Sequence, residues 1–317
     1  MSKILITGAA GMVGQTLLDL LGGMPELRII ATDIRRPKTM RDNAVFEQMD
    51  VRGPDPDTVF ATHKPDVVVH LASIVTPGKN STRDAEYAVD VTGTENVLVA
   101  CLEHKVRRVV VTSSGAAYGY HAENEMPLCE SDPVRGNVEF AYSWHKHLVE
   151  EMLSAAHRND PQLEQVVLRV GTVLGAGVEN QITGLFHKPR LLGLTGHDSP
   201  FVFIWTRDLA NILLRAATDG PTGIFNVAGD GAMRVQDLAA AMGKTVRWVP
   251  PRLIALALGI AKPLRLSRYG REQVRFLQYR PVLDNSALKN VFGYTPEKTS
   301  AEVFDLWWSA QSGQDRG

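Results

Sequence analysis

The stretch that decides the fold is Lys3-Ile-Leu-Ile-Thr-Gly-Ala-Ala-Gly-Met-Val-Gly14, or KILITGAAGMVG. A short apolar strand runs into the pattern G-x-x-G-x-x-G, and that pattern opens a helix. Gly8 allows a sharp turn, Gly11 lets the backbone approach a pyrophosphate, and Gly14 lets the helix pack on the strand. The free N–H groups and the positive dipole end of the helix favour phosphate. The stretch therefore predicts the first unit of a dinucleotide-binding domain.

The alternative is a plain turn between a strand and a helix, because a glycine triplet alone is a weak signal. Asp33 favours the cofactor interpretation. It lies about 20 residues after the glycines, at the end of the second predicted strand, where a carboxylate binds both ribose hydroxyls. A carboxylate there repels a 2′-phosphate, so we expect NAD, with NADP less favoured. Arg35 and Arg36 follow at once and offer a phosphate contact, although two solvated loop arginines are the simpler interpretation.

The first half of the chain alternates short β-branched runs with longer helical patterns. Near-continuous apolar strands are typical of parallel strands buried on both faces. The alternation predicts an α/β fold, a doubly wound Rossmann-type parallel sheet with right-handed crossovers. The expected strands are Lys3–Thr7, Arg28–Thr32, Val67–Leu71, Arg108–Thr112 and Gln165–Arg169, and the expected helices are Met12–Gly22, Asp55–His63, Asp84–His104 and Phe140–Asn159.

Beyond Arg169 the pattern loosens, and we expect a change of domain. Residues 1–170 are predicted to bind NAD, and residues 171–317 are predicted to form mostly a smaller α/β substrate-binding domain. A segment of about 201–227 is expected to return to the first domain. That segment contains a strand-like Phe201–Ile204, a helix from Arg207 and a strand-like Ile224–Val227, and the substrate pocket is expected from Gly171–Pro200 and Gly229–Tyr279.

The composition is that of an ordinary soluble globular protein, with 44% apolar and 22% charged residues. The formal net charge of −1 gives no indication of nucleic acid or of an anionic membrane surface as partner. Cys101 and Cys129 lack metal-ligand spacing and indicate reduced thiols in a cytoplasmic protein, so no metal is expected. The first residues lack the pattern of a secretory signal. The longest apolar run, Leu253–Ala261, is about half as long as a membrane span.

A second stretch that carries chemistry is Tyr142-Ser-Trp-His-Lys146. On a helix the tyrosine and the lysine share one face, because they are four residues apart. A free tyrosine has a pKa of about 10, too high for an efficient base at neutral pH. A nearby ammonium group and a positively charged nicotinamide are expected to lower that pKa. The lysine is also expected to bind ribose hydroxyls. The alternative is a tyrosine packed in the core beside a solvated lysine.

Tyr294-Thr-Pro-Glu-Lys298 has the same spacing. Pro296 disfavours helical geometry at Thr295, and Gly293 indicates a turn. We therefore interpret this pair as a surface turn that leads into the last helix.

A series of motifs follows along most of the chain: TGAAGMVG (7–14), Asp33, Asp50-Val51, HLAS (70–73), TSSGAAYG (112–119), Tyr142 with Lys146, LRVG (168–171), FIWTRDLA (203–210) and FNVAGDG (225–231). In identity and order they resemble the extended short-chain dehydrogenase/reductase family, which includes NAD-dependent sugar-nucleotide epimerases and dehydratases. The resemblance implies a Rossmann-type domain and a catalytic set of Ser114, Tyr142 and Lys146. Ser114 would donate a hydrogen bond to the substrate oxygen and polarise it, and Thr112 and Ser113 would lie on the cofactor side.

The resemblance also implies a set of residues that bind NAD, including Asp50-Val51 at the adenine amino group. The set is Gly8, Gly11, Met12, Val13, Gly14, Asp33, Asp50, Val51, Leu71, Ala72, Ser73, Thr112, Tyr142, Lys146 and Val170.

Three positions depart from the family pattern. Dehydratases of the family carry an Asp-Glu pair after the catalytic Ser or Thr, where this chain has Gly115 and Ala116. Sugar-nucleotide epimerases carry an asparagine where this chain has Thr172, and the family's N-x-x-G-T begins here with Asp90. These changes leave the redox residues intact and argue against dehydration of a sugar nucleotide.

The expected function is that of an NAD-dependent oxidoreductase, which transfers a hydride between nicotinamide and a hydroxyl or carbonyl carbon of a small molecule. One alternative is a sugar-nucleotide epimerase that retains its NAD. A more remote alternative is a non-catalytic NAD-binding sensor or scaffold. Helices Asp84–His104 and Phe140–Asn159 resemble the pair that forms a four-helix interface in the family, so we expect a homodimer. The substrate itself is not predicted.

Several residues keep two interpretations. His145 and His147 are expected to be surface or interface histidines rather than catalysts. The aromatic residues after the serine either line a substrate pocket or pack in the core: Tyr118, Tyr120 and His121. Leu253–Ala261 forms either an apolar lid or a buried core helix. Trp307-Trp308 is expected to pack the last helix onto the body.

Overall fold

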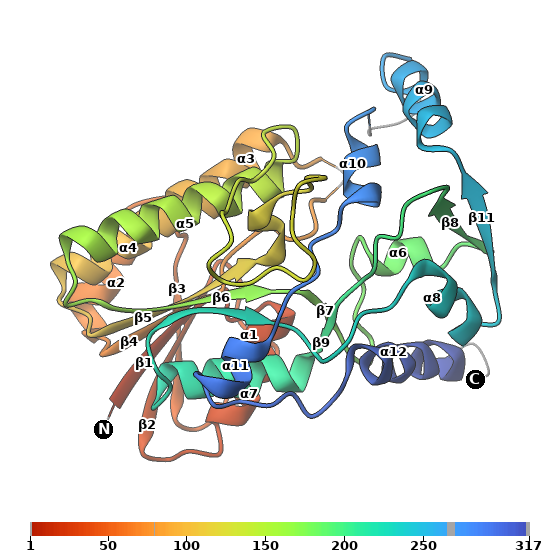
Figure 1. Ribbon diagram of the computed structural model, residues 1–317. Coiled ribbons are helices and arrows are strands. Elements are labelled where there is room, and N and C mark those ends of the chain that lie inside the picture. The colour runs from red at the N-terminus through yellow and green to blue at the C-terminus, as the bar shows by residue number, and fades with distance from the viewer. Residues whose placement is uncertain (1, 79, 265–269, 315–317) are drawn as a thin grey trace.

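The computed structural model describes residues 2–78, 80–264 and 270–314 (Figure 1). Its central element is a seven-stranded sheet in the order β10-β6-β5-β4-β1-β2-β3, and all neighbouring strands are parallel. The order reverses beside β1, so the carboxyl ends of β1 and β4 flank the switch point where ligands bind in such sheets. The strands are β1 (Ser2–Thr7), β2 (Leu27–Asp33), β3 (Ala44–Gln48), β4 (Val67–His70), β5 (Arg108–Ser114), β6 (Glu164–Val170) and β10 (Gly223–Val227).

Helices cover both faces of this sheet, which confirms the doubly wound fold. Side chains of a strand alternate between its faces. Ile4 and Ile6 therefore pack with α1, α7 and α11, whereas Leu5 packs with α2, α4 and α5. The helices are α1 (Met12–Leu21), α7 (Thr206–Ala217) and α11 (Ser286–Asn290) on one face, and α2 (Asp55–His63), α4 (Gly93–Glu103) and α5 (Ala141–Asn159) on the other.

The chain after β6 leaves the main sheet and then returns to it. β7 (Thr172–Leu174) pairs with β9 (Phe203–Trp205) in a separate two-stranded sheet. α7 then packs on the main sheet, and β10 pairs with β6 from Gly223 opposite Val166 to Val227 opposite Val170. The strand-like Phe201–Ile204 of the sequence thus corresponds to β9, with Phe201 in an isolated bridge to Met233.

A third cluster of buried side chains lies beside this return, and it is rich in aromatic rings. Phe186, Phe304 and Trp307 are fully buried there, and the Trp307 Nε1 donates to the Val178 carbonyl at 2.9 Å. The last helix is therefore packed onto the body, as expected. The elements of this region are α6 (Thr183–Phe186), β8 (Arg190–Leu194), α8 (Val235–Ala241), β11 (Thr245–Val249), α9 (Pro251–Ala261), α10 (Gln273–Gln278) and α12 (Ser300–Gln314).

Two local predictions differ from the structure. The single helix expected over Asp84–His104 consists of α3 (Arg83–Tyr87), a π-helical turn η1 (Ala88–Thr92) and then α4. The edge strand β3 is not among the expected strands, because its apolar run is only three residues long and none of its five side chains is buried.

Leu253–Ala261 is helical, but none of its side chains is buried, so the buried-core interpretation is wrong. Residues 265–269 of the expected substrate segment lie outside the described residues. Among the helices that the structure describes, we find none with the length and apolar character needed to cross a membrane.

Candidate active site

The predicted catalytic residues meet at the carboxyl end of the sheet. Ser114 is the last residue of β5, and Tyr142 and Lys146 lie in the first turns of α5. The Lys146 Nζ donates to the Thr112 carbonyl at 2.9 Å and lies 5.6 Å from the centre of the Tyr142 ring. The Ser114 Oγ accepts from the Ala116 N–H at 3.1 Å and donates to the Val170 carbonyl at 3.4 Å. The fold thus gathers Thr112, Ser114, Tyr142, Lys146 and Val170.

The protonation of Tyr142 differs from the sequence expectation. Burial raises its pKa to about 12, a hydrogen bond with Ser114 acts in the opposite direction, and the charge of Asp90 raises it further. The expected lowering of the pKa is therefore not found within the polypeptide. The hydroxyl is held as an acid, and a positive charge beyond those of the chain is needed to favour phenolate.

Lys146 is buried rather than solvated. Burial lowers the pKa of its ammonium group, and the charges of Asp90 and Glu150 counteract that effect. The alternative of a core tyrosine beside a solvated lysine is therefore wrong for the lysine.

Asp90 is a buried carboxylate at the centre of this region, and the π-helical turn η1 carries it. π-helical turns are frequent at functional sites. Its Oδ1 accepts from the Ser73 hydroxyl and the Ile74 N–H, both at 2.8 Å, and its Oδ2 lies 3.2 Å from the His145 Nδ1. His145 is fully buried, so its prediction as a surface residue is wrong.

His70 forms a second buried contact beside the lysine. Its Nδ1 lies 2.7 Å from the Thr7 hydroxyl and its Nε2 3.0 Å from the Thr94 hydroxyl. Burial lowers the pKa of His70 to about 3, and the charge of Lys146 adds to the effect. His70 is therefore neutral at physiological pH and holds β4 between β1 and α4.

Ser113 and Tyr118 belong to a buried ionic network behind the site. Glu150 accepts from the Ser113 hydroxyl at 2.5 Å and from Arg169 at 2.6 Å. Arg169 also donates to the Tyr118 hydroxyl at 2.8 Å, and Tyr118 donates to Asn226 at 2.9 Å. Ser113 therefore faces the protein interior rather than the cofactor side, and Tyr118 packs in the core rather than lining a pocket.

The glycine loop has the geometry that a pyrophosphate site needs. Gly8 has a φ of +68°, and a Cβ there would lie 2.7 Å from the Ala72 nitrogen, so a side chain would separate the loop from Leu71-Ala72. α1 begins after Gly11 without a side-chain cap and without an acid in its first turn. The N–H groups at the start of α1, where Met12 and Val13 lie, are thus open to an anion.

Asp33 lies at this loop, as predicted. Its Oδ2 accepts from the Ala10 N–H at 3.0 Å and its Oδ1 from the Arg35 N–H at 3.1 Å. Asp50 is engaged differently, because the Arg52 guanidinium binds both its carboxylate oxygens, the shorter contact being 2.6 Å. That ion pair lowers the pKa of Asp50. Val51 is buried and packs against Gly93.

Nothing in the sequence indicates Arg280, whose charge acts on Tyr120 as that of Tyr142 does. Its guanidinium carbon lies 3.9 Å from the centre of the Phe201 ring and 5.4 Å from that of Phe276. Its Nη1 donates to the Ser199 carbonyl at 2.7 Å, and among the described residues its buried Nε has no hydrogen-bond partner. Burial lowers the pKa of Arg280 to about 9, which indicates a cation without a compensating carboxylate.

Tyr120 connects Arg280 with Tyr142. Its ring contacts Phe276 at 5.1 Å, and charges on both Tyr142 and Arg280 act on its hydroxyl. Tyr120 also lines a cavity of about 360 Å³ together with His121, Arg275 and Tyr279. No motif identifies Arg280 in the sequence, because only the fold brings residue 280 within electrostatic reach of Tyr120.

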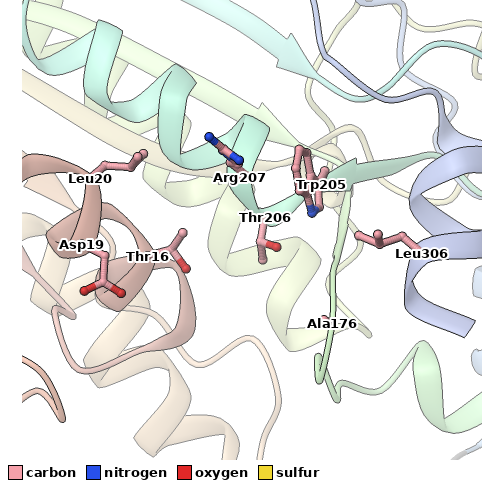
Figure 2. A pocket seen from close by; sticks show the side chains of 8 residues that line it. All are labelled: Thr16, Asp19, Leu20, Ala176, Trp205, Thr206, Arg207 and Leu306. Atoms are coloured by element: carbon pink, nitrogen blue, oxygen red, sulfur yellow. The ribbon is translucent and has the colours of Figure 1, made fainter. Parts of the chain in front are cut away.

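A separate hollow of about 480 Å³ lies between α1, α7 and α12 (Figure 2). Trp205 forms one wall, and the cations of Arg207 and Lys298 lie 5.8 Å and 5.1 Å from its ring centre. None of the predicted site residues lines this hollow.

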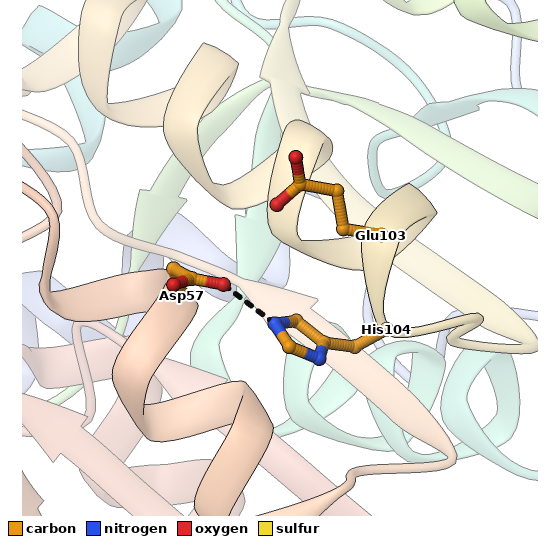
Figure 3. Close-up of side chains that lie close together, drawn as sticks. All are labelled: Asp57, Glu103 and His104. Carbon is orange, nitrogen blue, oxygen red and sulfur yellow. Dashed lines mark hydrogen bonds and ion pairs between the residues drawn. The ribbon is translucent and has the colours of Figure 1, made fainter.

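Asp57, Glu103 and His104 lie close together at the ends of α2 and α4 (Figure 3). Their ligand atoms are near enough for a metal ion, but the two acids are exposed. His104 already lies 2.7 Å from Asp57. We assign the group as a link between α2 and α4.

The second tyrosine–lysine pair lies in non-helical backbone before α12, as predicted. The Tyr294 hydroxyl donates to Asp208 at 2.7 Å. Tyr294 therefore holds the turn against α7.

The fold and the glycine loop define an α/β protein of the nicotinamide-dependent class. A family model described as the NAD dependent epimerase/dehydratase family matches residues 4–228. The protein belongs to this family and is an NAD-dependent enzyme.

Its relatives include sugar-nucleotide enzymes and proteins without an assigned activity. An uncharacterized protein of Mycobacterium tuberculosis (strain ATCC 25618 / H37Rv) is 26% identical over 308 residues, which cover 95% of this chain and 82% of the relative. A UDP-glucose 4-epimerase of Halalkalibacterium halodurans is 29% identical over 194 residues, covering 59% of this chain and 55% of that protein. The crystal structure of Thermus thermophilus UDP-glucose 4-epimerase with NAD has a TM-score of 0.73 at 22% identity and covers 98% of this chain and 99% of its own.

Proposed function

We propose that the protein transfers a hydride between NAD and a hydroxyl- or carbonyl-bearing carbon of an anionic small molecule, with Tyr142 as the acid/base. The observation that carries this proposal is the group that Ser114, Tyr142 and Lys146 form, in which the Lys146 Nζ lies 5.6 Å from the centre of the Tyr142 ring. The chemistry that NAD supplies when bound is hydride exchange with the substrate carbon.

The chain's own residues would hold the two ends of NAD. The glycine loop and the start of α1 would bind the pyrophosphate, and Asp33 would bind the adenosine ribose. The negative charge of Asp33 disfavours a 2′-phosphate, which supports NAD over NADP. Lys146 would bind the second ribose, and Ser73, Leu71 and Ala72 line the same side of the loop.

Tyr142 would move the proton. In the direction of reduction its neutral hydroxyl donates a proton to the oxygen of the forming alcohol, for which a pKa of about 12 is suitable. In the direction of oxidation the Tyr142 phenolate accepts the proton of the alcohol and becomes a neutral hydroxyl. The ammonium of Lys146 and the positive charge of oxidised nicotinamide together would favour that phenolate before the transfer. Ser114 would hold the substrate oxygen by a hydrogen bond.

Arg280 supports an anionic group on the substrate. An arginine that is stacked between two aromatic rings, with its Nε unpartnered among the described residues, can still form charge-assisted hydrogen bonds. A phosphate or carboxylate of the substrate would complete these bonds a short distance from Tyr142.

A second candidate is epimerisation of a sugar nucleotide with retained NAD. The name of the Halalkalibacterium relative favours it, and Arg280 suits a nucleotide diphosphate. Thr172 in place of the family asparagine counts against it. Wild-type protein incubated with UDP-glucose would then form UDP-galactose without releasing NADH, which nuclear magnetic resonance and NADH fluorescence would distinguish from net oxidation.

The first test replaces Tyr142 with phenylalanine. We expect Tyr142→Phe to lower the rate of NADH formation by roughly 10²- to 10⁴-fold, the usual contribution of a general acid/base, while NAD binds as in wild type. NADH fluorescence over a panel of hydroxylated substrates measures the rate, and calorimetry measures NAD binding.

Tyr294→Phe is the matched control, because it removes the hydroxyl of the other tyrosine–lysine pair. It should lose some stability, through the lost bond to Asp208, and keep its activity. An active Tyr142→Phe protein would falsify the assignment.

The second test replaces Arg280 with methionine, which preserves the stacked volume and removes the cation. Binding of UDP-glucose to the NAD-loaded protein, measured by calorimetry, is expected to weaken by roughly 10- to 100-fold, since a hydrogen bond to a charged group contributes about 1.5–3 kcal/mol. Arg207→Met is the control, because Arg207 also lies over an aromatic ring, that of Trp205, in a hollow that none of the predicted site residues lines. Equal binding to wild type and Arg280→Met would remove the anionic subsite.

We also propose a homodimer formed through α5 and the segment of α3, η1 and α4, supported by the exposed apolar side chains of Tyr87 on α3 and Val99 on α4. The two cysteines are free, which suits a cytoplasmic location. We propose the domain division expected from the sequence, with residues 1–170 and about 201–227 on the NAD side and most of residues 171–317 on the substrate side.

A further inference from the structure

Helix α9 presents a continuous apolar stripe to solvent. Leu253, Leu256, Ile260 and Leu264 are 57%, 55%, 54% and 61% exposed. The first three are spaced for one face of the helix, and Leu264 continues the same spacing just beyond its end. Leucines and isoleucines that are scattered singly on a surface are ordinary, whereas a contiguous exposed stripe marks an interaction site.

α9 contacts the body through the segment that leads into α10. The Arg271 side chain packs against Gly259 of α9, where a Cβ would leave no room for it. Lys262, just after α9, forms an ion pair of 2.6 Å with Glu272, just before α10. α9 therefore projects from the molecule beside α10 (Figure 1), and no described side chain of α9 is buried.

The segment that carries the stripe is strongly cationic. Without residues 265–269, which lie outside the described residues, residues 251–275 contain one acid, Glu272, and four basic residues, so they carry a net charge of +3 although the whole chain has −1. The four basic residues are Arg252, Lys262, Arg271 and Arg275, and Arg275 forms an ion pair of 3.0 Å with Glu139. The rest of the chain thus carries −4.

We propose that α9 is a peripheral membrane-binding helix that lies in the surface of a bilayer containing anionic lipids. An apolar helix face flanked by Lys and Arg is the arrangement that binds in the plane of such an interface, and clustered cations bind anionic lipid head groups. The 11 residues of α9 have a length of about 16 Å, half of the roughly 30 Å hydrocarbon core, so the helix lies on the bilayer rather than crossing it.

Charge also distinguishes this occupant from a second copy of the chain. A symmetric contact between two α9 helices would bring together two segments whose described residues each carry +3, and like charges at such a contact repel. An anionic lipid surface would instead bury the apolar stripe and bind the basic side chains at the same time. The placement beside α10, which lines the cavity near Tyr120, would hold the entrance to the proposed substrate site close to the membrane.

The test is co-sedimentation of the full-length protein with two kinds of vesicle. One contains phosphatidylcholine alone and the other contains equal parts of phosphatidylcholine and phosphatidylglycerol. We expect binding to the mixed vesicles, little binding to the neutral ones, and loss of binding as salt is added. Leu256→Glu should weaken binding to the mixed vesicles at least about tenfold, since it removes a leucine side chain that the bilayer would bury.

Val291→Glu is the matched control, because Val291 is 63% exposed and follows α11, away from α9. Both variants should keep the thermal unfolding temperature and the NAD affinity of wild type. Arg252→Gln is a second variant and should weaken binding only to the mixed vesicles.

Five results would overturn the proposal. The first four are failure to bind either kind of vesicle, equal binding to both, equal loss of binding in Val291→Glu, and self-association that light scattering shows to depend on Leu256. The fourth result would assign α9 to contact with a second copy. A change of substrate KM in Leu256→Glu with unchanged sedimentation would likewise overturn it, in favour of a lid.

Discussion

The residue that controls the electrostatics of the proposed site is Asp90. It is buried, it holds Ser73, Ile74 and His145 by hydrogen bonds, and its charge acts on both Tyr142 and Lys146. Burial has the largest effect on both pKa values, and the negative charge of Asp90 raises each of them. The carboxylate therefore favours the protonated tyrosine and the charged lysine. An amide at this position would make the same contact with Ser73 and Ile74 without the charge.

Asp90→Asn therefore removes the negative charge of residue 90 and keeps the size and shape of its side chain. Because the carboxylate raises the pKa of Tyr142, its removal should lower that pKa, and the Tyr142 phenolate should form at lower pH than in wild type. Ultraviolet difference titration against Tyr142→Phe measures this ionisation without any substrate. The other groups around the hydroxyl are Ser114, Tyr120 and Lys146, and all are unchanged in this variant.

Asp84→Asn provides the control, since it removes the same charge from an exposed position on α3. Its phenolate titration should coincide with that of wild type. A titration in Asp90→Asn that is unmoved, or moved to higher pH, would contradict the role given to Asp90.

At the scale of single residues, the motif residues could be predicted from the sequence, whereas the buried groups around them could not. Ser114, Tyr142 and Lys146 follow from spacing and resemblance, and the fold brings them together. His145 was expected at the surface because its neighbours on the helix gave no sign of Asp90, which lies 55 residues earlier in the chain. Arg280 had no local signal at all, since its surroundings come from Phe201 and Phe276.

Among the elements, the packing of α1 on the glycine loop depends on the absence of a side chain at Gly14. A Cβ on Gly14 would lie 2.5 Å from the Gly8 carbonyl oxygen and 2.8 Å from the Ala9 Cα. Both are backbone atoms of the loop, so neither can rotate away. A side chain at residue 14 would therefore displace α1 from β1, and the N-terminus of α1 would shift away from the glycine loop.

Gly14→Ala is accordingly expected to cost about 1–3 kcal/mol of unfolding free energy, as overpacking does, and to weaken NAD binding. Gly184→Ala is the control, because Gly184 is also helical and its Cβ would meet open space. That variant should be neutral or stabilising by up to about 1 kcal/mol. Denaturant unfolding and NAD calorimetry measure both, and equal behaviour of the two variants would contradict the argument.

Element boundaries were predicted to within a few residues where the apolar pattern was strong. β1, β2 and β5 appear where the β-branched runs predicted them. The break at η1 was not predictable from periodicity, because a π-helical turn adds one residue to an otherwise continuous helical pattern. The sequence predicted a helix at α9 but not whether that helix is buried, since an apolar run has the same pattern in a core and at an interface.

For the whole molecule, the parallel sheet and its layers were predictable, since strand–helix alternation leaves few topologies. The return of the chain through α7 and β10 was expected only as a segment of about 201–227. The proposed dimer belongs to this scale as well, because it joins the outer helices of two such sheets.

Val99→Glu tests that dimer. Val99 is 45% exposed on α4, and in a symmetric interface a new carboxylate would be buried near its own copy, which is unfavourable. Light scattering should give a dimer mass for wild type and a monomer mass for the variant, with unchanged circular dichroism. Val291→Glu should remain a dimer, and a wild-type monomer would end the proposal.

The place of β10 in the sheet has a consequence for how the protein is made. A ribosome releases β6 while β7, α6, β8, β9 and α7 are still to be synthesised, and only then does β10 arrive to pair with it. Arg108 of β5 also lacks its hydrogen-bond partners during this time, because its guanidinium donates to the carbonyls of Ala216 and Gly220. During that interval β6 is an open, apolar strand edge, the kind of surface that chaperones cover and that otherwise aggregates. The nascent chain is therefore most vulnerable between the emergence of Val170 and that of Val227.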